Sequence, residues 1–466
     1  MSYLEISKRL LESGFQSYMV GGAVRDMFMG ENPSDFDIAT DAVPDQLINL
    51  FSDRKINLVG KSFGVCIIDG TEVATFRKDR NIINGAKNCE VTFADNIKDD
   101  LIRRDLTING IAICCQSHRI IDFSDGVNHI ENKIIKFIGS PLERMEEDPA
   151  RIVRACRFLA KIDGMFDVYT KETLHKYGFY ISHVAPERIR LELLKAMKIQ
   201  KASKFFYALD SIGVLDYIFP ELCDCVGHDH GNYHGEDVFT HMMIAGDSIS
   251  TKYPLVKLAA YLHDIGKPQA YEDGKFIEHE KMGYNILQED LRNLKFSNDE
   301  IDFISLMCRH HMNSTADMSP KSARKILKKL GESNLNLSDF MRLKIADRKG
   351  NLAKPNKTFG EIRNSLRCFK TSSLNINNFG PKDLDISGGG LIEIFKLPKN
   401  KVVSELQKHL VSHVLEHGEE SNNRINLIQL ANVFLMVEYL GDNPLFEFTG
   451  LSDQELENLG ANYKED

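Results

Sequence analysis

The chain has 466 residues, which exceeds what a single compact core usually supports, so we expect about two to four domains. Apolar residues make up 42% and charged residues 27%, a composition that is typical of a folded soluble protein and excludes a disordered or fibrous one. The formal net charge of −9 argues against a protein that coats DNA or RNA indiscriminately, because such binding needs many basic groups.

The two ends of the chain carry apolar segments that could suggest export or a membrane anchor. The N-terminal sequence MSYLEISKRLLESGF instead predicts an amphipathic helix, without the long apolar run of a signal peptide. The stretch from Leu427 to Leu440 is interrupted by polar residues and predicts a buried helix rather than a membrane span. The nine cysteines are mostly isolated, as in a reducing compartment. We therefore expect a cytoplasmic protein with no membrane partner.

The periodicity of the chain changes near residue 136. Residues 16 to 120 alternate short strand-like runs with Gly, Asp and Asn, which predicts a mixed sheet with helices. From about residue 136 the periodicity is helical almost throughout, with breaks in composition at Gly227 to Gly235 and after Asp347. The fold class is therefore α+β, an α/β head followed by an elongated all-α body. The predicted domains are 1–135, 136–226, 227–355 and 356–466.

The first chemical motif combines a glycine pair with two carboxylates. Gly21 and Gly22 follow an apolar strand and precede a helix, where backbone amides can approach phosphate oxygens. Asp35 and Asp37 lie two residues apart on a segment of strand character, which would place both carboxylates on one face about 7 Å apart. Such a pair can hold divalent ions, most naturally Mg²⁺. A plain turn is the alternative for the Asp pair alone, and the glycines with Arg25 favour the metal site.

A run of charged residues follows a predicted helix start at Ser140. Asp148, Arg151, Arg154 and Arg157 recur every three positions, so we expect all four side chains on one helical face. A carboxylate at Asp148 can accept from the amino group of cytosine or adenine, while the Arg151 guanidinium donates to the ring nitrogen. This pair would admit CTP and ATP and reject GTP and UTP. Surface ion pairs are the alternative for the pair considered alone.

Six motifs between residues 16 and 200 resemble, in order and spacing, those of the class II tRNA nucleotidyltransferase and bacterial poly(A) polymerase family. They are GGAVRD, DFDIAT, EVATFR, RRDLTING, EDPARIVRACRF and ERIRLE. The resemblance implies a nucleotidyltransferase head in which Asp35 and Asp37 bind the catalytic Mg²⁺. Glu72, in EVATFR, is a candidate for a third carboxylate because this motif predicts an adjoining strand.

The same resemblance implies the groups that hold the nucleotide. Gly22 and Arg25 would contact the triphosphate. Arg104 and Asp105 resemble a pair that reads the ribose, in which Asp105 accepts a hydrogen bond from the 2′-hydroxyl.

Family features distinguish CCA addition to tRNA from polyadenylation. Lys61, Phe63 and Gly64, together with DLDISGGGLIEIF near the end, resemble the CCA-adding members, and no basic C-terminal tail is present. These features imply tRNA as the partner and CTP and ATP as substrates. The loop between Arg77 and Arg103 is full length, which favours the complete activity; its markers are Asn84, Gly85, Lys87 and Phe93. A poly(A) polymerase and a CC-adding or A-adding partial enzyme remain alternatives.

The histidines of the helical body resemble the ligand set of HD phosphohydrolases. The four expected ligands are His241, His263, Asp264 and Asp347, and two further ones are His279 and His310, with His311 as an alternative to His310. Imidazole suits Zn, Ni, Mn or Fe, which would activate water to hydrolyse phosphomonoesters or 2′,3′-cyclic phosphates. An inactive HD fold, and an HD nucleotidase whose head only binds tRNA, are the alternatives. The oligomeric state, monomer or homodimer, is left open.

Overall fold

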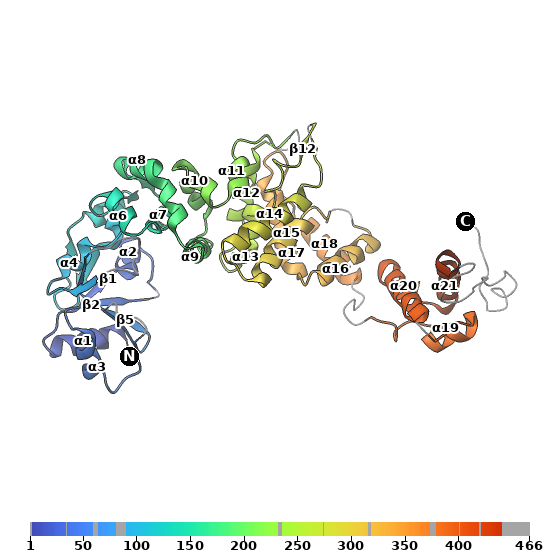
Figure 1. Cartoon of the computed structure of the whole chain (residues 1–466), viewed down its shortest axis with the longest axis horizontal. Coiled ribbons are helices and arrows are strands. Elements are labelled where there is room, and N and C mark those ends of the chain that lie inside the picture. The colour runs from blue at the N-terminus through green and yellow to red at the C-terminus, as the bar shows by residue number, and fades with distance from the viewer. Residues whose placement is uncertain are drawn as a thin grey trace. The chain divides into compact units, whose positions relative to one another are not determined.

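The computed structural model divides the chain into two compact units (Figure 1). The first consists of Met1–Cys308 with Gly350–Ala353, and the second of Arg309–Lys349 with Lys354–Asp466. The structure describes residues 2–33, 35–58, 64–80, 90–231, 235–273, 275–315, 318–372, 379–399, 401–418 and 421–439. The predicted markers Lys61, Phe63, Asn84, Gly85 and Lys87 lie outside these described residues.

The head of the first unit is built on a seven-stranded mixed sheet, as the sequence predicts. The strand order is β3-β4-β5-β2-β1-β8-β9, and β2 and β5 are its parallel neighbours. The strands are β1 (Tyr18–Val20), β2 (Asp37–Thr40), β3 (Ile56–Asn57), β4 (Val65–Ile68), β5 (Thr71–Thr75), β8 (Ile111–Cys114) and β9 (Ile120–Asp122). A separate antiparallel pair is formed by β6 (Arg77–Arg80) and β7 (Glu90–Phe93).

Short helices pack on this sheet. They are α1 (Tyr3–Glu12), α2 (Gly22–Phe28), α3 (Pro44–Leu50), α4 (Ile97–Ile102), the 3-10 turn η3 (Thr107–Asn109) and α5 (Gly126–Glu131). The predicted N-terminal amphipathic helix is confirmed as α1, which begins after a capping box between Ser2 and Glu5. Its apolar residues Ile6 and Leu10 are fully buried in a core shared with Ile38 of β2.

The rest of the first unit is almost wholly helical, as predicted. Its helices and 3-10 turns are α6 (Pro141–Glu147), α7 (Arg151–Ile162), α8 (Val168–Tyr177), η4 (Gly178–His183), α9 (Pro186–Ala196), α10 (Ser203–Ser211), η5 (Leu215–Tyr217), α11 (Pro220–Asp224), α12 (Val238–Asp247), α13 (Pro254–Leu262), α14 (His279–Asn293) and α15 (Asn298–His310, which extends into the second unit). The exceptions are two short strand pairs, β10 (Ile134–Ile135) with β11 (Met165–Phe166) and β12 (Tyr271–Glu272) with β13 (Lys275–Phe276).

The second unit is helical in its described part. Its helices are α16 (Pro320–Glu332), α17 (Leu337–Gly350, whose last residue belongs to the first unit), α18 (Phe359–Ser372), α19 (Gly388–Phe395), α20 (Lys401–His417) and α21 (Arg424–Tyr439). Leu427, Ile428 and Leu435 of α21 are fully buried, which confirms the predicted buried helix. Among the helices described, none has both the length and the apolar character that crossing a bilayer requires.

Candidate nucleotidyl-transfer and metal sites

The glycine turn of the head lies directly against the predicted carboxylates. Gly21 follows β1 and caps α2 with φ of +73°, a left-handed conformation that favours glycine, and Gly22 starts α2. A Cβ atom on Gly21 would lie 3.3 Å from the Oδ2 atom of Asp37. Val20 pairs with Asp37 across β1 and β2, so strand register fixes this approach. Glycine suits this position because a side chain would approach the carboxylate closely and would require a backbone conformation that other residues rarely adopt.

Three carboxylates of the head influence one another. Ile38 pairs with Val73 in parallel register, so Asp37 and Glu72 precede paired residues on neighbouring strands and share the other face of the sheet. Burial, followed by the charge of Glu72 and more weakly that of Asp35, raises the pKa of Asp37 to about 6, although Arg104 opposes this shift. Asp35 itself precedes β2 rather than lying within it. Grouped carboxylates with a raised pKa fit a divalent cation, which would relieve their repulsion.

The predicted ribose-reading pair follows α4. Arg104 donates to Asp100 (Nη2 to Oδ2, 3.0 Å), and its Nη1 atom lies 3.5 Å from where a Gly21 Cβ would be. Arg103 donates to the other oxygen of Asp100 (Nη2 to Oδ1, 2.6 Å). The buried Asp100 therefore orients both arginines, a role that the sequence did not identify although KDDLIRRD places it three and four residues before them.

Asp105, the second member of that pair, is held by the protein itself. Its Oδ1 atom accepts from the Leu106 amide at 2.8 Å and from Asn109 at 3.1 Å, and its Oδ2 accepts from Arg154. Burial alone would raise the pKa of Asp105, but the Arg154 guanidinium and these hydrogen bonds lower it to about 2. Since Arg154 lies on α7, this contact brings the arginine helix to the head.

Three of the predicted arginines converge on one aromatic ring. The guanidinium carbons of Arg25, Arg154 and Arg157 lie 4.8, 5.0 and 4.1 Å from the centroid of the Phe158 ring. Arg25 also donates to Asn109 Oδ1 at 2.9 Å. Cation–π contacts thus hold side chains that come from α2 and α7 close together. The predicted contact between Arg25 and a triphosphate stays a prediction.

The predicted base-selecting helix differs from expectation at Asp148. Asp148 caps the end of α6 with extended dihedral angles (φ −153°, ψ 97°), and α7 begins at Arg151. The prediction of one continuous face for all four residues was therefore wrong for Asp148. The reason is Pro149, which disfavours helical conformation in the residue before it. Arg151, Arg154 and Arg157 do share a helix.

Asp148 and Arg151 each have protein partners. Asp148 accepts a bidentate pair of hydrogen bonds from Arg188 of α9, both at 2.8 Å. Arg151 forms an ion pair with Glu147, and Arg157 one with Glu192 of α9. Neither Arg188 nor Glu147 was identified from the sequence. The ERIRLE motif, which contains Arg188 and Glu192, was the available signal.

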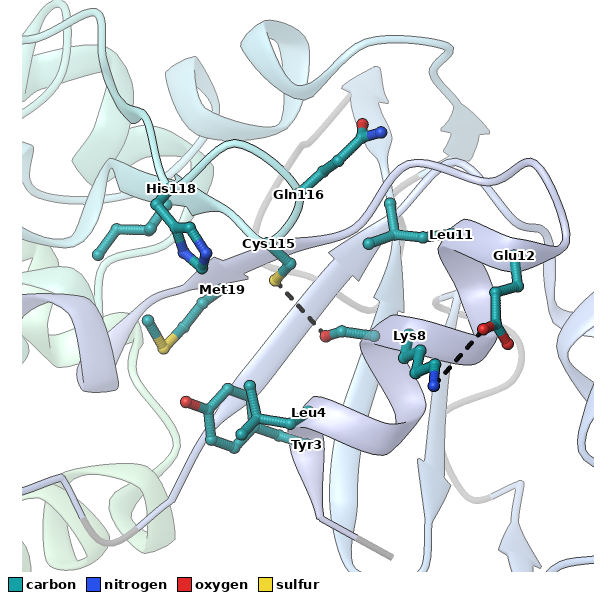
Figure 2. A pocket seen from close by; sticks show the side chains of 11 residues that line it. Tyr3, Leu4, Lys8, Leu11, Glu12, Met19, Cys115, Gln116 and His118 are labelled. Carbon is teal, nitrogen blue, oxygen red and sulfur yellow. Dashed lines mark hydrogen bonds and ion pairs between the residues drawn. The ribbon is translucent and has the colours of Figure 1, made fainter.

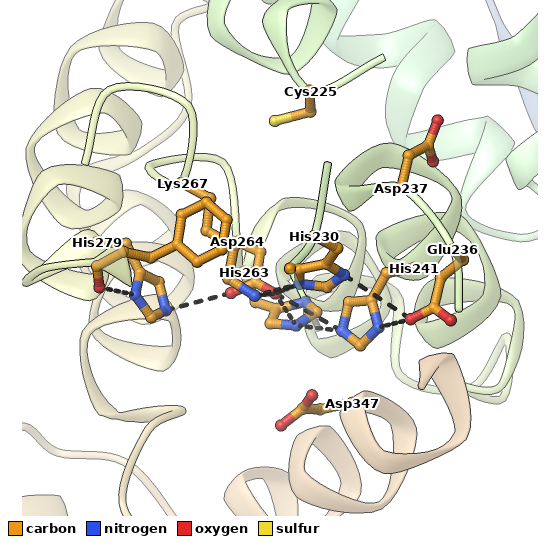
Figure 3. Close-up of polar contacts among 12 residues, drawn as sticks. Cys225, His230, Glu236, Asp237, His241, His263, Asp264, Lys267, His279 and Asp347 are labelled. Carbon is orange, nitrogen blue, oxygen red and sulfur yellow. Dashed lines mark hydrogen bonds and ion pairs between the residues drawn. The ribbon is translucent and has the colours of Figure 1, made fainter. Parts of the chain in front are cut away.

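A second cluster, in the helical part of the first unit, gathers predicted HD ligands (Figure 3). His241, His263, Asp264 and His279 are at most 5% exposed. The Nε2 atoms of His241 and His263 lie 3.2 Å apart, and the Nε2 atom of His279 lies 3.4 Å from Asp264 Oδ1. These four side chains, predicted from their resemblance to HD enzymes, do come together.

The hydrogen bonds of the three histidines fix which nitrogen is available. The Nδ1 atoms of His263 and His279 face the carbonyl oxygens of Ala260 at 2.9 Å and Phe276 at 3.1 Å. A carbonyl only accepts, so each Nδ1 carries the proton and a neutral ring leaves Nε2 as a lone-pair donor. His241 is arranged alike, with Nδ1 at 3.3 Å from Glu236. Such convergence of unprotonated nitrogens on a carboxylate fits a transition-metal ion.

Two buried residues of this cluster were missed by the sequence analysis. His230 Nε2 lies 3.5 Å from Asp264 Oδ2, and His230, His241 and Asp264 form a group that could hold a metal ion. Burial lowers the pKa of His230 to about 4, so its ring is neutral near pH 7. Glu236, beside His241, also accepts from the Leu352 amide at 2.9 Å. The histidine-rich segment GHDHG was the signal for His230.

The remaining predicted HD ligands belong to the second unit. Asp347, on α17, pairs with Lys344 at 3.0 Å, and His310 Nε2 lies 2.8 Å from the Ser333 hydroxyl. His311 is buried, and its carbonyl accepts from Lys344. Their participation in the metal site stays a prediction.

The head also contains a cavity of about 380 Å³ beside α1 (Figure 2). Its lining is mainly apolar, with Leu4, Leu11, Met19 and Ile113, and includes Cys115, whose sulfur lies 3.5 Å from the Ser7 hydroxyl. No predicted site residue lines it. The cavity is therefore separate from the carboxylate site.

Comparison with known proteins agrees with this architecture. Three family models match, described as "Poly A polymerase head domain" (residues 17–136), "Probable RNA and SrmB- binding site of polymerase A" (166–225) and "HD domain" (232–348). Among solved structures, the Bacillus stearothermophilus CCA-adding enzyme in complex with CTP is 22% identical with a TM-score of 0.64, covering 93% of this chain and 97% of that one. The sheet, the glycine turn and the carboxylates define the protein as a nucleotidyltransferase.

Curated relatives give the family. The CCA-adding enzyme of Anoxybacillus flavithermus is 31% identical over 321 residues, which cover 67% of this chain and 72% of that protein. The CCA-adding enzyme of Bacillus subtilis is 39% identical over 199 residues, 42% of this chain and about half (49%) of the relative. That of Bacillus licheniformis is 28% identical over 90% of this chain and 95% of its own length. The chain belongs to the class II tRNA nucleotidyltransferase and poly(A) polymerase family and carries an HD domain.

Proposed function

We propose that the protein adds C, C and A to the 3′ end of tRNA from CTP and ATP, without a nucleic-acid template. The proposal rests on the grouped carboxylates of Asp35, Asp37 and Glu72, of which Asp37 lies against the Gly21 turn. Relatives that match over most of this chain are CCA-adding enzymes, and solved CCA-adding enzymes of the same fold have been captured with CTP and with ATP. Mg²⁺ is the cofactor that the carboxylates suit.

Different residues of the head are assigned to metal binding and to phosphate binding in the transfer reaction. Bound Mg²⁺ would activate the attacking 3′ hydroxyl and neutralise the leaving pyrophosphate. Asp35 and Asp37 hold the ion, and Glu72 adds a third carboxylate to the same group. Arg104, oriented by Asp100, lies beside the Gly21 turn and supplies positive charge for the phosphates.

Base selection is assigned to Asp148 and Arg151. Asp148 is paired with Arg188, and Arg151 with Glu147. These partners orient the two side chains, and each side chain keeps hydrogen-bonding capacity for the pairing edge of a base. Cytosine and adenine offer an amino donor beside a ring acceptor, whereas uracil and guanine would leave both charges facing groups of the wrong polarity.

A direct assay distinguishes CCA addition from the other activities of the family, which are poly(A) addition and partial addition of CC or A. The protein is incubated with Mg²⁺, tRNA that lacks its CCA end, and each nucleotide in turn. We expect two C residues from CTP alone and a homogeneous stop after CCA with CTP and ATP together. A ladder of A residues would identify a poly(A) polymerase, the activity named for a Haemophilus influenzae relative that is 33% identical over 232 residues. A stop at CC, or addition of A alone, would identify a partial enzyme.

Substitution at the carboxylates tests the site itself. Asp37→Ala, and separately Asp35→Ala, should lower CTP incorporation at least about a hundredfold, because each removes a ligand of the catalytic ion. Asp53→Ala is the control, since Asp53 is an exposed head carboxylate paired with Arg9. If both site variants retained CTP incorporation, the assignment of Asp35 and Asp37 as metal ligands would be wrong.

A second function is supported by the buried histidine cluster. We infer that the HD domain hydrolyses phosphomonoesters or 2′,3′-cyclic phosphates with Zn, Ni, Mn or Fe. A metal held there would act as a Lewis acid and lower the pKa of water. The four histidine Nε2 atoms that lie within 3.6 Å of an Asp264 oxygen support this interpretation over an inactive HD fold. Hydrolysis of 2′,3′-cyclic AMP that is lost on chelation and restored by one of these metals is the expected result.

A further inference from the structure

Aromatic side chains gather on the surface where α8 ends and η4 begins. Tyr177 ends α8, and Phe179, Tyr180 and His183 follow in the 3-10 turn η4. Side chains three residues apart eclipse in a 3-10 turn, so Tyr177, Tyr180 and His183 form one column. Phe179 lies beside this column. We name Tyr177, Phe179, Tyr180 and His183 the aromatic platform.

The ring geometry of the platform follows from this turn. The Tyr177 and Tyr180 rings are nearly parallel, with 12° between their planes and 6.3 Å between centroids. The centroid of the Phe179 ring lies 4.8 Å from that of Tyr180, and the His183 ring lies 6.0 Å from it on the other side. The four rings therefore pack against one another and form one aromatic patch.

The platform is partly exposed to solvent, with Tyr177 and Tyr180 half-buried. Phe179 is 46% exposed, and His183 is also exposed. Lys176 lies next to it, with its Nζ atom 5.0 Å from the centroid of the Tyr177 ring. Exposed aromatic faces beside positive charge are what proteins use to bind single-stranded nucleic acid, because every base has a face that stacks.

Contacts connect the platform to the proposed base-selecting residues. The Tyr180 hydroxyl donates to Glu146 at 3.5 Å, in the last turn of α6 and two residues before Asp148. Arg188, which pairs with Asp148, follows His183 by five residues along the chain. A hydrogen bond thus connects the platform to the helix that Asp148 caps. Its residues also lie within 166–225, the segment matched by a model for an RNA-binding site.

We propose that the aromatic platform binds the unpaired bases at the 3′ end of the RNA substrate by stacking. The inference rests on the proposed transferase function and specifies a subsite for its RNA. A growing 3′ end must place its terminal hydroxyl beside the incoming nucleotide, and its preceding bases are unpaired. Phe179 presents an exposed ring to the bases, and the positive charge of Lys176 would attract the phosphates. Stacking suits this task because it holds C and A alike.

Binding of a fluorescent RNA tests the platform without catalysis. The full-length protein is titrated into an RNA hairpin with a 3′ overhang that contains 2-aminopurine, whose fluorescence falls when it stacks, and into the same hairpin with a blunt end. Phe179→Ala should weaken binding of the overhang RNA about tenfold, within the range for one lost stacking contact, and leave the blunt RNA unaffected. Phe179→Trp should restore binding.

A matched control is available in the head. Phe123 is a phenylalanine of similar exposure (51%) with a lysine, Lys98, 5.6 Å from its ring centroid, and Phe123→Ala should bind both RNAs as the unaltered protein does. In turnover, Phe179→Ala should raise the KM for RNA and leave that for CTP unchanged. Equal affinity and equal quenching in Phe179→Ala would overturn the platform, and would favour a protein partner for this surface.

The same RNA distinguishes failure of the platform from failure of the proposed function. If the unaltered protein adds C to the hairpin and Phe179→Ala binds like it, the platform alone is wrong. If quenching depends on Phe179 but no nucleotide is added, the transferase proposal is wrong and the platform stands. Equal melting temperatures of the variants confirm that the exposed substitution leaves the fold intact.

Discussion

At the scale of single residues, Glu72 offers the sharpest test of the carboxylate site. Its charge is a principal cause, after burial, of the raised pKa of Asp37. Glu72→Gln removes that charge and one oxygen ligand, so we expect a higher Mg²⁺ concentration for half-maximal CTP incorporation and an activity about 10- to 100-fold lower at low Mg²⁺. Asp69→Asn, in the turn that joins β4 and β5, serves as the control and should leave the Mg²⁺ dependence unchanged.

Asp148 governs selection rather than rate. Asp148→Ala leaves Arg151 as the only charged reader of the base, so we expect the ratio of kcat/KM for CTP to that for UTP to fall about 10- to 100-fold, the value of a hydrogen bond to a charged group. Glu187→Ala, an exposed carboxylate in the first turn of α9, is the matched control. Undiminished discrimination against UTP in Asp148→Ala would refute its role.

The sequence predicted individual residues better than their partners. Asp37, Arg154 and His263 could be proposed from the sequence because each lies in a motif whose chemistry is local, and their roles stay predictions. The pairing of Asp148 with Arg188 joins residues 40 positions apart, and depends on how α9 packs against the break between α6 and α7. Such contacts follow from tertiary packing, which periodicity does not encode.

At the scale of elements, the sequence pattern predicted the start of α6 but not the break between α6 and α7. The sequence predicts the Ser140 cap, and the structure confirms it, with the Ser140 hydroxyl accepting from the Glu143 amide. Spacing by three alone suggested a helix through Asp148, but Pro149 removes an amide donor and turns the preceding residue out of the helix. The break frees Asp148 to face α9.

A partly buried carboxyl group on α14, Asp290, should make the stability of the protein depend on pH, and no sequence motif predicts this effect. Burial, with the charges of Glu221 on α11 and Glu289, raises the pKa of Asp290 on α14 to about 7. The folded protein then binds more protons than the unfolded one between about pH 4 and pH 7, so this group lowers stability as pH rises through that window. Asp290→Asn should therefore stabilise the protein at pH 8 by about 1–3 kcal/mol, allowing for partial solvation.

Thermal melting at two pH values measures this effect. The gain in Tm of Asp290→Asn over the unaltered protein should be clear at pH 8 and should shrink at pH 5. Glu272→Gln, an exposed carboxylate on β12, should show no such change with pH. A gain of equal size at both pH values would show that ionisation of Asp290 is not its cause.

At the scale of the whole molecule, the predicted α+β class and the mixed-sheet head are confirmed, while the division into four domains stays a prediction. Apolar residues recur every second position in the head and every third or fourth position in the body, and this difference was enough to separate the sheet from the helices. The strand order β3-β4-β5-β2-β1-β8-β9 could not be predicted from the sequence. Strands β2 and β5, which bring Asp37 beside Glu72, are separated along the chain by residues 41–70. Register of this kind is set by packing, not by local composition.

We propose two chemical centres in the first unit, and their activities should be separable. Asp264 is 2% exposed, and it is surrounded by Lys267 and by four histidines, namely His230, His241, His263 and His279. Asp264→Asn keeps the side-chain volume but removes the anionic oxygen on which the histidine nitrogens converge. We expect loss of the bound transition metal, measured by elemental analysis of the purified protein, and loss of cyclic-phosphate hydrolysis, with CTP incorporation unchanged. His279→Gln, at the edge of the cluster, provides a second variant if Asp264→Asn melts at a lower temperature.

The reciprocal variant completes the argument. Asp37→Asn should abolish CTP incorporation and leave the transition-metal content and the hydrolysis intact, because its carboxylate belongs to the sheet and not to the helical cluster. Loss of both activities in either variant would mean that the two centres act as one, and that the HD cluster supports nucleotide addition rather than a chemistry of its own. Because the carboxylates belong to the sheet and the histidines to the helical part, we expect each variant to lose one activity and to keep the other.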